Sequence, residues 1–126
     1  MFENTDASAN LAVKDLQKAR EFYEGTLGLK QVGSAGDELV VYKSGKSLIN
    51  VYRSEFAGTN RATALTWAVG KDVEGVVKKL KDKGVAFEHY DMPGMTRKGD
   101  VHVDDRHMKV AWFKDPDGNI LNIVNQ

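Results

Sequence analysis

The sequence predicts an α+β protein of two βαβββ modules, each a curved antiparallel sheet backed by one helix. The main observation is a pattern of strand, capped helix, glycine and strand that occurs twice, at residues 11–32 and 67–90. Short strand-like runs with glycine-containing joints follow both copies. A chain of 126 residues fits one compact domain. We therefore expect a single domain over residues 1–126, with modules at about 1–57 and 58–126.

The two copies of the pattern keep a fixed offset. Val13 and Val69 end the first strands of the two copies, and they lie 56 positions apart. Gly28 and Gly84 end the two helices, and they are also 56 positions apart. One offset shared by two landmarks indicates a duplicated supersecondary unit.

Two amphipathic helices are expected, at about residues 15–27 and 72–83. In each, apolar residues recur at a spacing of three or four, which places them on one helix face. Asp15 and Asp72 stand where a side chain can cap the first turn. The apolar stripes, which should pack on the convex faces of the sheets, are Leu16, Ala19, Tyr23 and Leu27, and Val73, Val76, Val77 and Leu80.

Strand-like runs fill the rest of each module. They lie at 29–32, 38–42 and 47–52 in the first module, and at 85–90, 101–103, 108–113 and 119–124 in the second. Asp115-Pro116-Asp117-Gly118, between the last two runs, is typical of a type I turn. The loop over residues 92–99 is either a plain connection or a lid over a binding site, and we expect the connection.

Charge and composition exclude several classes of partner. The 18 Lys and Arg residues balance the 18 Asp and Glu residues, so no overall charge attracts nucleic acid. No apolar run approaches the ~18 residues of a membrane span, and the first residues are polar, unlike a signal peptide. The chain has no Cys, which excludes disulfides, zinc–thiolate sites and cysteine nucleophiles. These features predict a cytoplasmic protein.

Two longer motifs carry a family resemblance. The segments NLAVKDLQKAREFYEGTLGL and WFKDPDGNILNIV resemble motifs of the vicinal oxygen chelate superfamily. This superfamily includes glyoxalase I, extradiol dioxygenases, and fosfomycin and bleomycin resistance proteins. The resemblance implies a glyoxalase-like fold in which curved sheets surround a cup, and it implies a homodimer. The reaction stays open, because one fold hosts many chemistries.

The resemblance also implies where a metal ion would bind. In catalytic members, the first and last strands of each half supply four side chains that hold one divalent ion. Counting from the motifs carries these positions to Ser8, Asn50, Ala64 or Leu65, and Asn122. None of these residues is a good ligand for a catalytic divalent metal, because the set contains no imidazole and no carboxylate. We therefore expect no metal and no other cofactor.

The same positions are candidates for binding a ligand. Asn50 and Asn122 would offer amide donors and acceptors inside the cup, with Tyr52 beside Asn50 as an apolar wall and Ser8 on the first strand. Alternatively, the two amides hydrogen-bond to each other, to water or to the backbone. No catalytic residue is assigned.

Three functions follow from the resemblance. The first is a metal-free binder of a small organic molecule, similar to bleomycin resistance proteins. The second is a lyase or dioxygenase-like enzyme with a displaced metal site or metal-free chemistry. The third is a dimer whose cup is vestigial. The missing ligands favour the first.

Histidines and tryptophans of the second module complete the set of candidates. His89, His102 and His107 would form a metal site only if they converged, and the spacing does not require this, so we expect surface or hairpin positions. Trp67 and Trp112 lie on expected strands, and the pattern does not decide between core packing and a stacking surface for a planar ligand.

Overall fold

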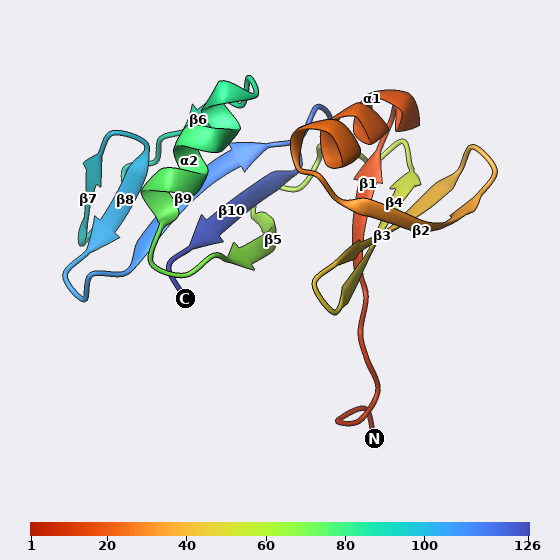
Figure 1. Cartoon of the computed structure of the whole chain (residues 1–126), viewed down its shortest axis with the longest axis horizontal. Helices are drawn as coiled ribbons and strands as arrows, with labels where there is room; N and C mark the ends of the chain where they lie inside the picture. The colour runs from red at the N-terminus through yellow and green to blue at the C-terminus, as the bar shows by residue number, and fades with distance from the viewer. The chain divides into compact units, whose positions relative to one another are not determined.

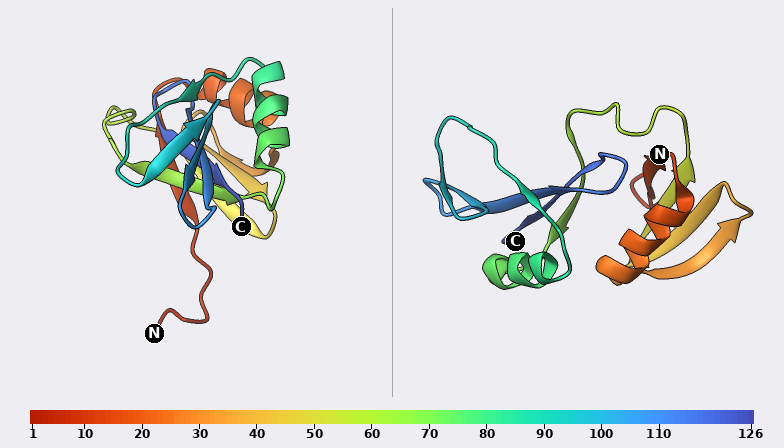
Figure 2. Two further views of the ribbon diagram at one scale, coloured as in Figure 1. Left: turned by 90° about the vertical axis from the view of Figure 1, so that its left-hand side faces the viewer. Right: turned by 90° about the horizontal axis from the view of Figure 1, so that it is seen from above.

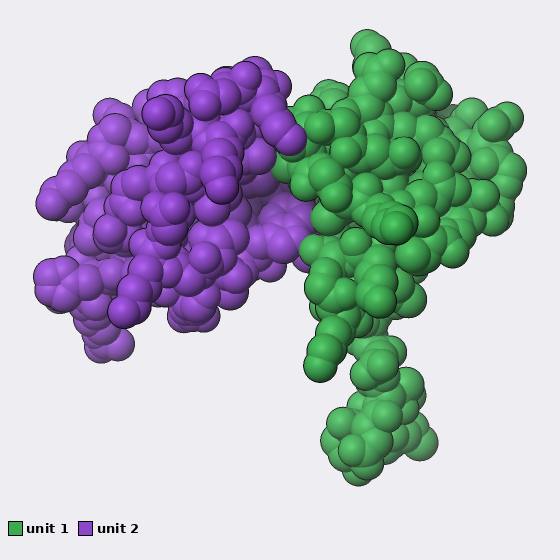
Figure 3. Space-filling view, viewed as in Figure 1, with its two compact units in different colours: residues 1–60, 116–119 green, residues 61–115, 120–126 purple.

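The computed structural model describes residues 1–126 and divides into two compact units (Figure 3). Unit 1 comprises residues 1–60 and 116–119, and unit 2 comprises residues 61–115 and 120–126. Each unit is a sheet with one helical segment against one face (Figures 1 and 2). The predicted α+β class is confirmed, and unit 1 has the βαβββ order, whereas unit 2 has two further strands after its helix.

The sheet of unit 1 has the order β1-β4-β3-β2. Its strands are β1 (Ala9–Val13), β2 (Lys30–Ala35), β3 (Leu39–Ser44) and β4 (Ser47–Arg53). The pairs β2–β3 and β3–β4 are antiparallel, as expected, whereas β1 pairs parallel with β4. The parallel pair arises because the chain crosses the whole sheet between its first and last strand.

One face of this sheet packs against the helical segment. Its inward side chains alternate along the strands and are fully buried: Leu11, Val13, Val40, Tyr42, Ile49 and Val51. The helix α1 (Leu16–Arg20) is capped by Asp15, whose carboxylate accepts from the Lys18 amide at 3.1 Å. The chain then widens into a π-helical turn, η1 (Glu21–Thr26), in which the Leu27 amide donates to the Phe22 carbonyl.

The sheet of unit 2 has the order β5-β10-β9-β8-β7, with β6 also paired to β9. Its strands are β5 (Thr63–Ala68), β6 (Phe87–Glu88), β7 (Met95–Lys98), β8 (Val101–Asp104), β9 (Lys109–Lys114) and β10 (Ile120–Val124). Here β5 pairs parallel with β10, which repeats the arrangement of unit 1. The helix α2 (Val73–Asp82) is capped by Asp72, as predicted. Neither helix has the length and apolar content needed to cross a membrane.

The two faces of this sheet carry different tryptophans. Lys109 Nζ lies 2.6 Å from Glu74 Oε1 of α2. The side of β9 that carries Lys109, Ala111 and Phe113 therefore faces the helix. The Trp67 ring stacks on Phe113, with centroids 6.5 Å apart, and therefore lies on the same side. Trp112 points to the opposite face. The structure thus shows that Trp67 lies on the helix side of the sheet and Trp112 on the other side, which the sequence pattern left undecided.

The segment between α2 and β9 differs most from expectation. The predicted strand over residues 85–90 is reduced to Phe87–Glu88, because only these two residues pair with β9. The predicted loop over residues 92–99 contains β7, which forms a hairpin with β8 through a turn at Gly99. Unit 1 has no counterpart of this β7–β8 hairpin.

Candidate functional site

In unit 1, the expected ligand-facing residues lie on the sheet face opposite α1. Asn50 and Tyr52 alternate with the buried residues Ile49 and Val51, which face the helix. The register places Asn50 beside Asn10 of β1, and Asn50 Nδ2 donates to Asn10 Oδ1 at 3.2 Å. Asn10 was missed by the sequence analysis, although it lies on the same side of β1 as Ala12 and position 8. The amide pair is the polar centre of this face.

Apolar side chains surround the amide pair. Leu48 is 40% exposed and Tyr52 is 38% exposed, and both lie on β4 on the same face as Asn50. Val41 of β3 is directly across from Asn50. Ser8 lies just before β1 and is exposed, so it extends this face without belonging to the sheet. The surface thus combines apolar area with one hydrogen-bonded pair of amides.

In unit 2, Asn122 lies on the sheet face opposite α2. Its neighbours in the strand, Leu121 and Ile123, pair with Phe113 and Ala111 on the helix side. Asn122 is only 8% exposed, and its Oδ1 atom is buried without a hydrogen-bond partner. A buried acceptor in this state costs ~1–3 kcal/mol. An amide left unsatisfied in a strand is a feature that a ligand can relieve.

The strands beside Asn122 define its surroundings. On β9 its partner in the register is Trp112, and on β5 its partner is Thr66. Of the two positions that the sequence analysis left open, Ala64 lies on the same face as Thr66 and Asn122, whereas Leu65 lies on the helix side with Trp67.

Trp112 is the centre of an aromatic cluster on this face. It packs with Val110 and Val124, and against the half-buried Tyr90 and Met95. The His102 ring meets the Trp112 ring edge-on, with centroids 4.8 Å apart. The Trp112 Nε1–H group donates to Thr63 Oγ1 at 3.1 Å, which fixes the indole in place.

His102 is the clearest departure from the sequence-based expectation. We predicted surface or hairpin histidines, but His102 is 1% exposed. The Tyr90 amide donates to its Nε2 atom at 3.0 Å, whereas its Nδ1 atom is buried without a partner. His102 does lie in a hairpin strand, but it is not at the surface, because the chain from Tyr90 to Met95 covers this side of β8.

The other two histidines do occupy exposed positions. His89 Nε2 lies 2.7 Å from Asp100 Oδ1, and Lys81 Nζ lies 2.8 Å from Asp100 Oδ2. These two contacts hold the pKa of the Asp100 carboxyl below its ordinary value. His107 sits in the β8–β9 turn with a φ of 63°. The three histidine side chains therefore lie in three different local environments.

The residues at the superfamily's metal positions do not fit a divalent ion. Ser8, Asn50 and Asn122 offer only neutral oxygens, Ala64 and Leu65 offer no side-chain donor, and Asn50 is engaged with Asn10. No group of three or more His, Asp or Glu side chains comes together in an arrangement that could hold a metal. The absence of a bound metal remains a prediction for the protein itself.

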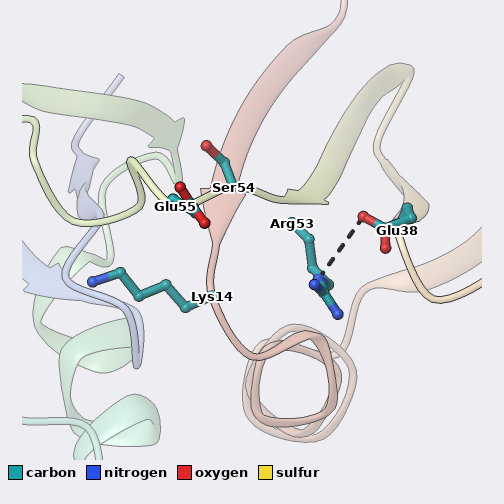
Figure 4. Close-up of a pocket in the computed structure, with 5 residues that line it drawn as sticks. All are labelled: Lys14, Glu38, Arg53, Ser54 and Glu55. Carbon is teal, nitrogen blue, oxygen red and sulfur yellow. Dashed lines mark ion pairs between the residues drawn. The ribbon is translucent and has the colours of Figure 1, made fainter.

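Unit 1 contains an open hollow of about 530 Å³, away from the amide pair (Figure 4). It is lined by Lys14, Glu38, Arg53, Ser54 and Glu55. Arg53 Nε lies 3.8 Å from Glu38 Oε2, and Figure 4 shows Lys14 extending away from this pair. The charges of its two cations and two anions cancel, and all four side chains are exposed to solvent. The hollow therefore has no net charge and no wall that is shielded from water. It gives a ligand little to recognise.

Unit 2 contains a smaller cavity of about 310 Å³. We call it the hairpin pocket; its lining residues are Tyr90, Asp91, Met92, Pro93, Met95, Arg97 and His102. Burial raises the pKa of the Tyr90 phenol, and the Glu88 carboxylate raises it further. The phenol therefore keeps its proton at neutral pH.

Comparison with known proteins identifies the family. Residues 7–123 match the family described as the Glyoxalase/Bleomycin resistance protein/Dioxygenase superfamily. The chain belongs to this superfamily. No curated protein matches the sequence.

Solved structures show the same superfamily fold. The glyoxalase family protein from Enterococcus faecalis has a TM-score of 0.76 at 20% identity, covering 98% of this chain and 99% of its own. Lactoylglutathione lyase from Agrobacterium tumefaciens has a TM-score of 0.74 at 18% identity, covering 96% and 92%. The fosfomycin resistance protein FosX from Mesorhizobium loti has a TM-score of 0.70 at 12% identity, covering 100% and 94%. At these identities the similarity establishes the fold alone.

Proposed function

We propose that this superfamily member is a small-molecule-binding protein that acts without the usual metal site. The observation that carries the proposal is the buried Asn122 Oδ1 atom, which lacks a partner on a face that also presents Trp112. The ligand is a small, partly planar organic molecule. Asn50 and Asn122 are its polar anchors, Tyr52 is an apolar wall, and Ser8 lies at the margin.

The energetics support this assignment. A ligand donor that satisfies Asn122 Oδ1 removes a penalty of ~1–3 kcal/mol. Coverage of Tyr52, which is more than a third exposed, adds ~25 cal/mol for each Å² of apolar surface removed from water. The Asn10–Asn50 pair keeps a free amide hydrogen and free lone pairs, so it can receive a ligand without first breaking its own bond.

The alternative is a lyase or dioxygenase-like enzyme. Lactoylglutathione lyase from Agrobacterium tumefaciens shares the fold and is named for such a reaction. A displaced metal site would need at least three ligands close together, and no such cluster supports it. We therefore place binding ahead of catalysis.

We further propose that the two modules form one domain, that the protein is a homodimer, and that it is cytoplasmic. The homodimer rests on the superfamily resemblance and on the exposed Leu48 side chain of β4. The cytoplasmic location rests on the absence of Cys.

The test is a thermal-shift screen of aromatic and cationic metabolites and antibiotics, followed by titration of any hit. Asn50→Leu and Asn122→Leu should each weaken binding by about tenfold or more, which corresponds to ~1.4 kcal/mol. Asn4→Leu, in the exposed N-terminal segment, is the matched control and should bind as the wild type does. If both site variants bind a hit with unchanged affinity, the proposed site is wrong.

A further inference from the structure

The hairpin pocket contains two hydrogen-bond donors that the protein leaves unused. Tyr90 Oη and His102 Nδ1 are both buried without partners, and both side chains line the pocket. Their rings lie 6.4 Å apart between centroids and are inclined by 30°. Proteins rarely bury two such groups side by side, because each unsatisfied group costs free energy.

The tautomer of His102 follows from its one hydrogen bond. The Tyr90 amide donates to Nε2, so Nε2 is an acceptor, and in the neutral imidazole the proton is then on Nδ1. The Tyr90 phenol is protonated, as its raised pKa requires, and it therefore also offers a hydrogen. Two residues that line the pocket thus carry buried donors that lack an acceptor.

The rest of the pocket defines the ligand around that acceptor. Met95 and Tyr90 pack against Trp112, which gives the pocket an apolar floor suited to a planar group. Arg97 and Asp91 also line it, and their charges cancel. Arg97 Nη1 donates to the Gly99 carbonyl at 2.7 Å, which holds the guanidinium at the β7–β8 turn while its other donors remain available.

We infer that the hairpin pocket binds the carbonyl or carboxylate oxygen of a small planar molecule, with Tyr90 Oη–H and His102 Nδ1–H as donors. This inference rests on the proposed function, because Trp112 joins the pocket to the face that carries Asn122. It goes further by naming the ligand's polar group, an sp² oxygen, and by adding two residues. The β7–β8 hairpin, absent from unit 1, is the element that creates the pocket.

The experiment uses benzamide, benzoate and benzylamine as probes of the full-length protein. Benzamide carries a neutral acceptor oxygen, benzoate an anionic one, and benzylamine has neither. Binding is followed by the NMR signals of the Trp112 indole N–H and the His102 ring. We expect benzamide or benzoate to shift both signals and benzylamine to shift neither. If the natural ligand carries a neutral carbonyl group, benzamide should bind more tightly than benzoate. If it carries a carboxylate, benzoate should bind more tightly than benzamide.

Variants then test the two donors separately. Tyr90→Phe removes only the hydroxyl, and should weaken binding of the better probe by about fivefold, the effect of one ordinary hydrogen bond. Tyr42→Phe is the matched control, because it removes a buried tyrosine hydroxyl from unit 1 and should leave probe affinity unchanged. His102→Phe removes the second donor, and His102→Gln should recover part of the affinity, because its amide can both accept from Tyr90 and donate to the probe.

Two outcomes overturn the inference and leave the proposed function intact. In the first, no probe shifts either signal although the thermal-shift screen yields a ligand. In the second, Tyr90→Phe and His102→Phe both fold and bind the probes as the wild type does, while Asn50→Leu or Asn122→Leu weakens binding. The reverse pattern, with loss only in the Tyr90 and His102 variants, supports the hairpin pocket and rejects the two asparagines as anchors.

Discussion

Asn122 shows how a single side chain can be unfavourable for folding and useful for binding. It occupies a strand position where both sequence neighbours, Leu121 and Ile123, are buried apolar residues. Its Oδ1 atom is enclosed without a partner, so the folded protein carries the cost of removing it from water. A residue retained at such a cost is a candidate for a functional role. A mutation at this position can show its effects on ligand binding and on stability separately.

Asn122→Leu should therefore stabilise the folded protein while it weakens ligand binding. The expected gain in the free energy of unfolding is about 1 kcal/mol, because the unsatisfied acceptor is replaced by an apolar group of similar size. Urea denaturation, followed by fluorescence, measures it. Asn50→Leu is the comparison, since its amide is half-buried and hydrogen-bonded to Asn10, and it should give no such gain. A clear loss of stability in Asn122→Leu would show that Oδ1 is satisfied in solution.

Tyr42 supplies a pH-dependent contribution in unit 1. Its fully buried hydroxyl donates to Glu24 Oε2 at 2.6 Å, and burial, followed by this bond, raises the pKa of the phenol. Tyr42→Phe should lower the free energy of unfolding by about 1–2 kcal/mol at neutral pH. The folded protein holds this proton more tightly than the unfolded chain does. The contribution is therefore complete below the ordinary tyrosine pKa of ~10, and it is lost as the pH rises beyond it.

Denaturation of the wild type and of Tyr42→Phe at neutral and alkaline pH tests this sign. The difference between the two proteins should shrink above pH ~10. A difference that grows with pH would mean that the folded state favours the ionised phenol.

Between elements, Asp100 connects α2, the residue after β6 and the β7–β8 turn. It accepts from Lys81 of α2 and contacts His89, and both contacts lower its pKa. A lowered carboxyl pKa stabilises the folded state above the unfolded pKa of ~4, and this stabilisation disappears as the pH falls through the folded pKa. The β7–β8 hairpin should consequently loosen in acid before the rest of the sheet does.

Asp100→Asn should reproduce this loosening at neutral pH. Hydrogen exchange of the β7 amides should become faster in the variant, and the difference from the wild type should shrink as the pH falls below ~4. Asp105→Asn, in the exposed β8–β9 turn, serves as the control and should leave exchange in β7 unchanged. Equal protection of β7 in the wild type and in Asp100→Asn would contradict the role of Asp100 as a connection.

The elements also show what the sequence could and could not predict. Both helix caps and both apolar stripes followed from spacing, because helix periodicity is a local property. The strand β7, with the sequence MTRK, has no apolar alternation and could not be distinguished from a loop. The burial of His102 in β8 could not be predicted, because nothing local reveals that the chain from Tyr90 to Met95 covers it.

The candidate site was predictable to a similar extent. The motifs placed Asn50, Tyr52 and Asn122 on the correct side of their strands, since side chains alternate with a period of two. Asn10 was not singled out because its contact with Asn50 depends on the parallel pairing of β1 with β4, which is set by distant parts of the chain. The hairpin pocket requires three segments to meet, and no single pattern contains that information.

For the whole molecule, the proposed homodimer leads to a prediction about the exposed face of β4. Leu48 is 40% exposed, and in a dimer such a residue would be covered by the second copy. Leu48→Lys should shift the protein toward the monomer in sedimentation velocity experiments. Gln17→Lys, on the exposed side of α1, is the control for added charge and should leave the sedimentation coefficient unchanged. A wild-type protein that sediments as a monomer at all concentrations would refute the homodimer.

The parallel pairing of β5 with β10 has a consequence for synthesis on the ribosome. β5 ends at Ala68, whereas its partner begins at Ile120, so β5 emerges long before β10 exists. At about 5–20 residues per second the delay is about 3–10 s. Unit 1 also lacks one of its contacts until Asn119 is synthesised, because Asn119 Nδ2 donates to the Ala12 carbonyl at 2.7 Å. The nascent chain therefore carries an open strand edge until β10 has left the exit tunnel, and a chain that stalls before β10 is exposed to aggregation along β5.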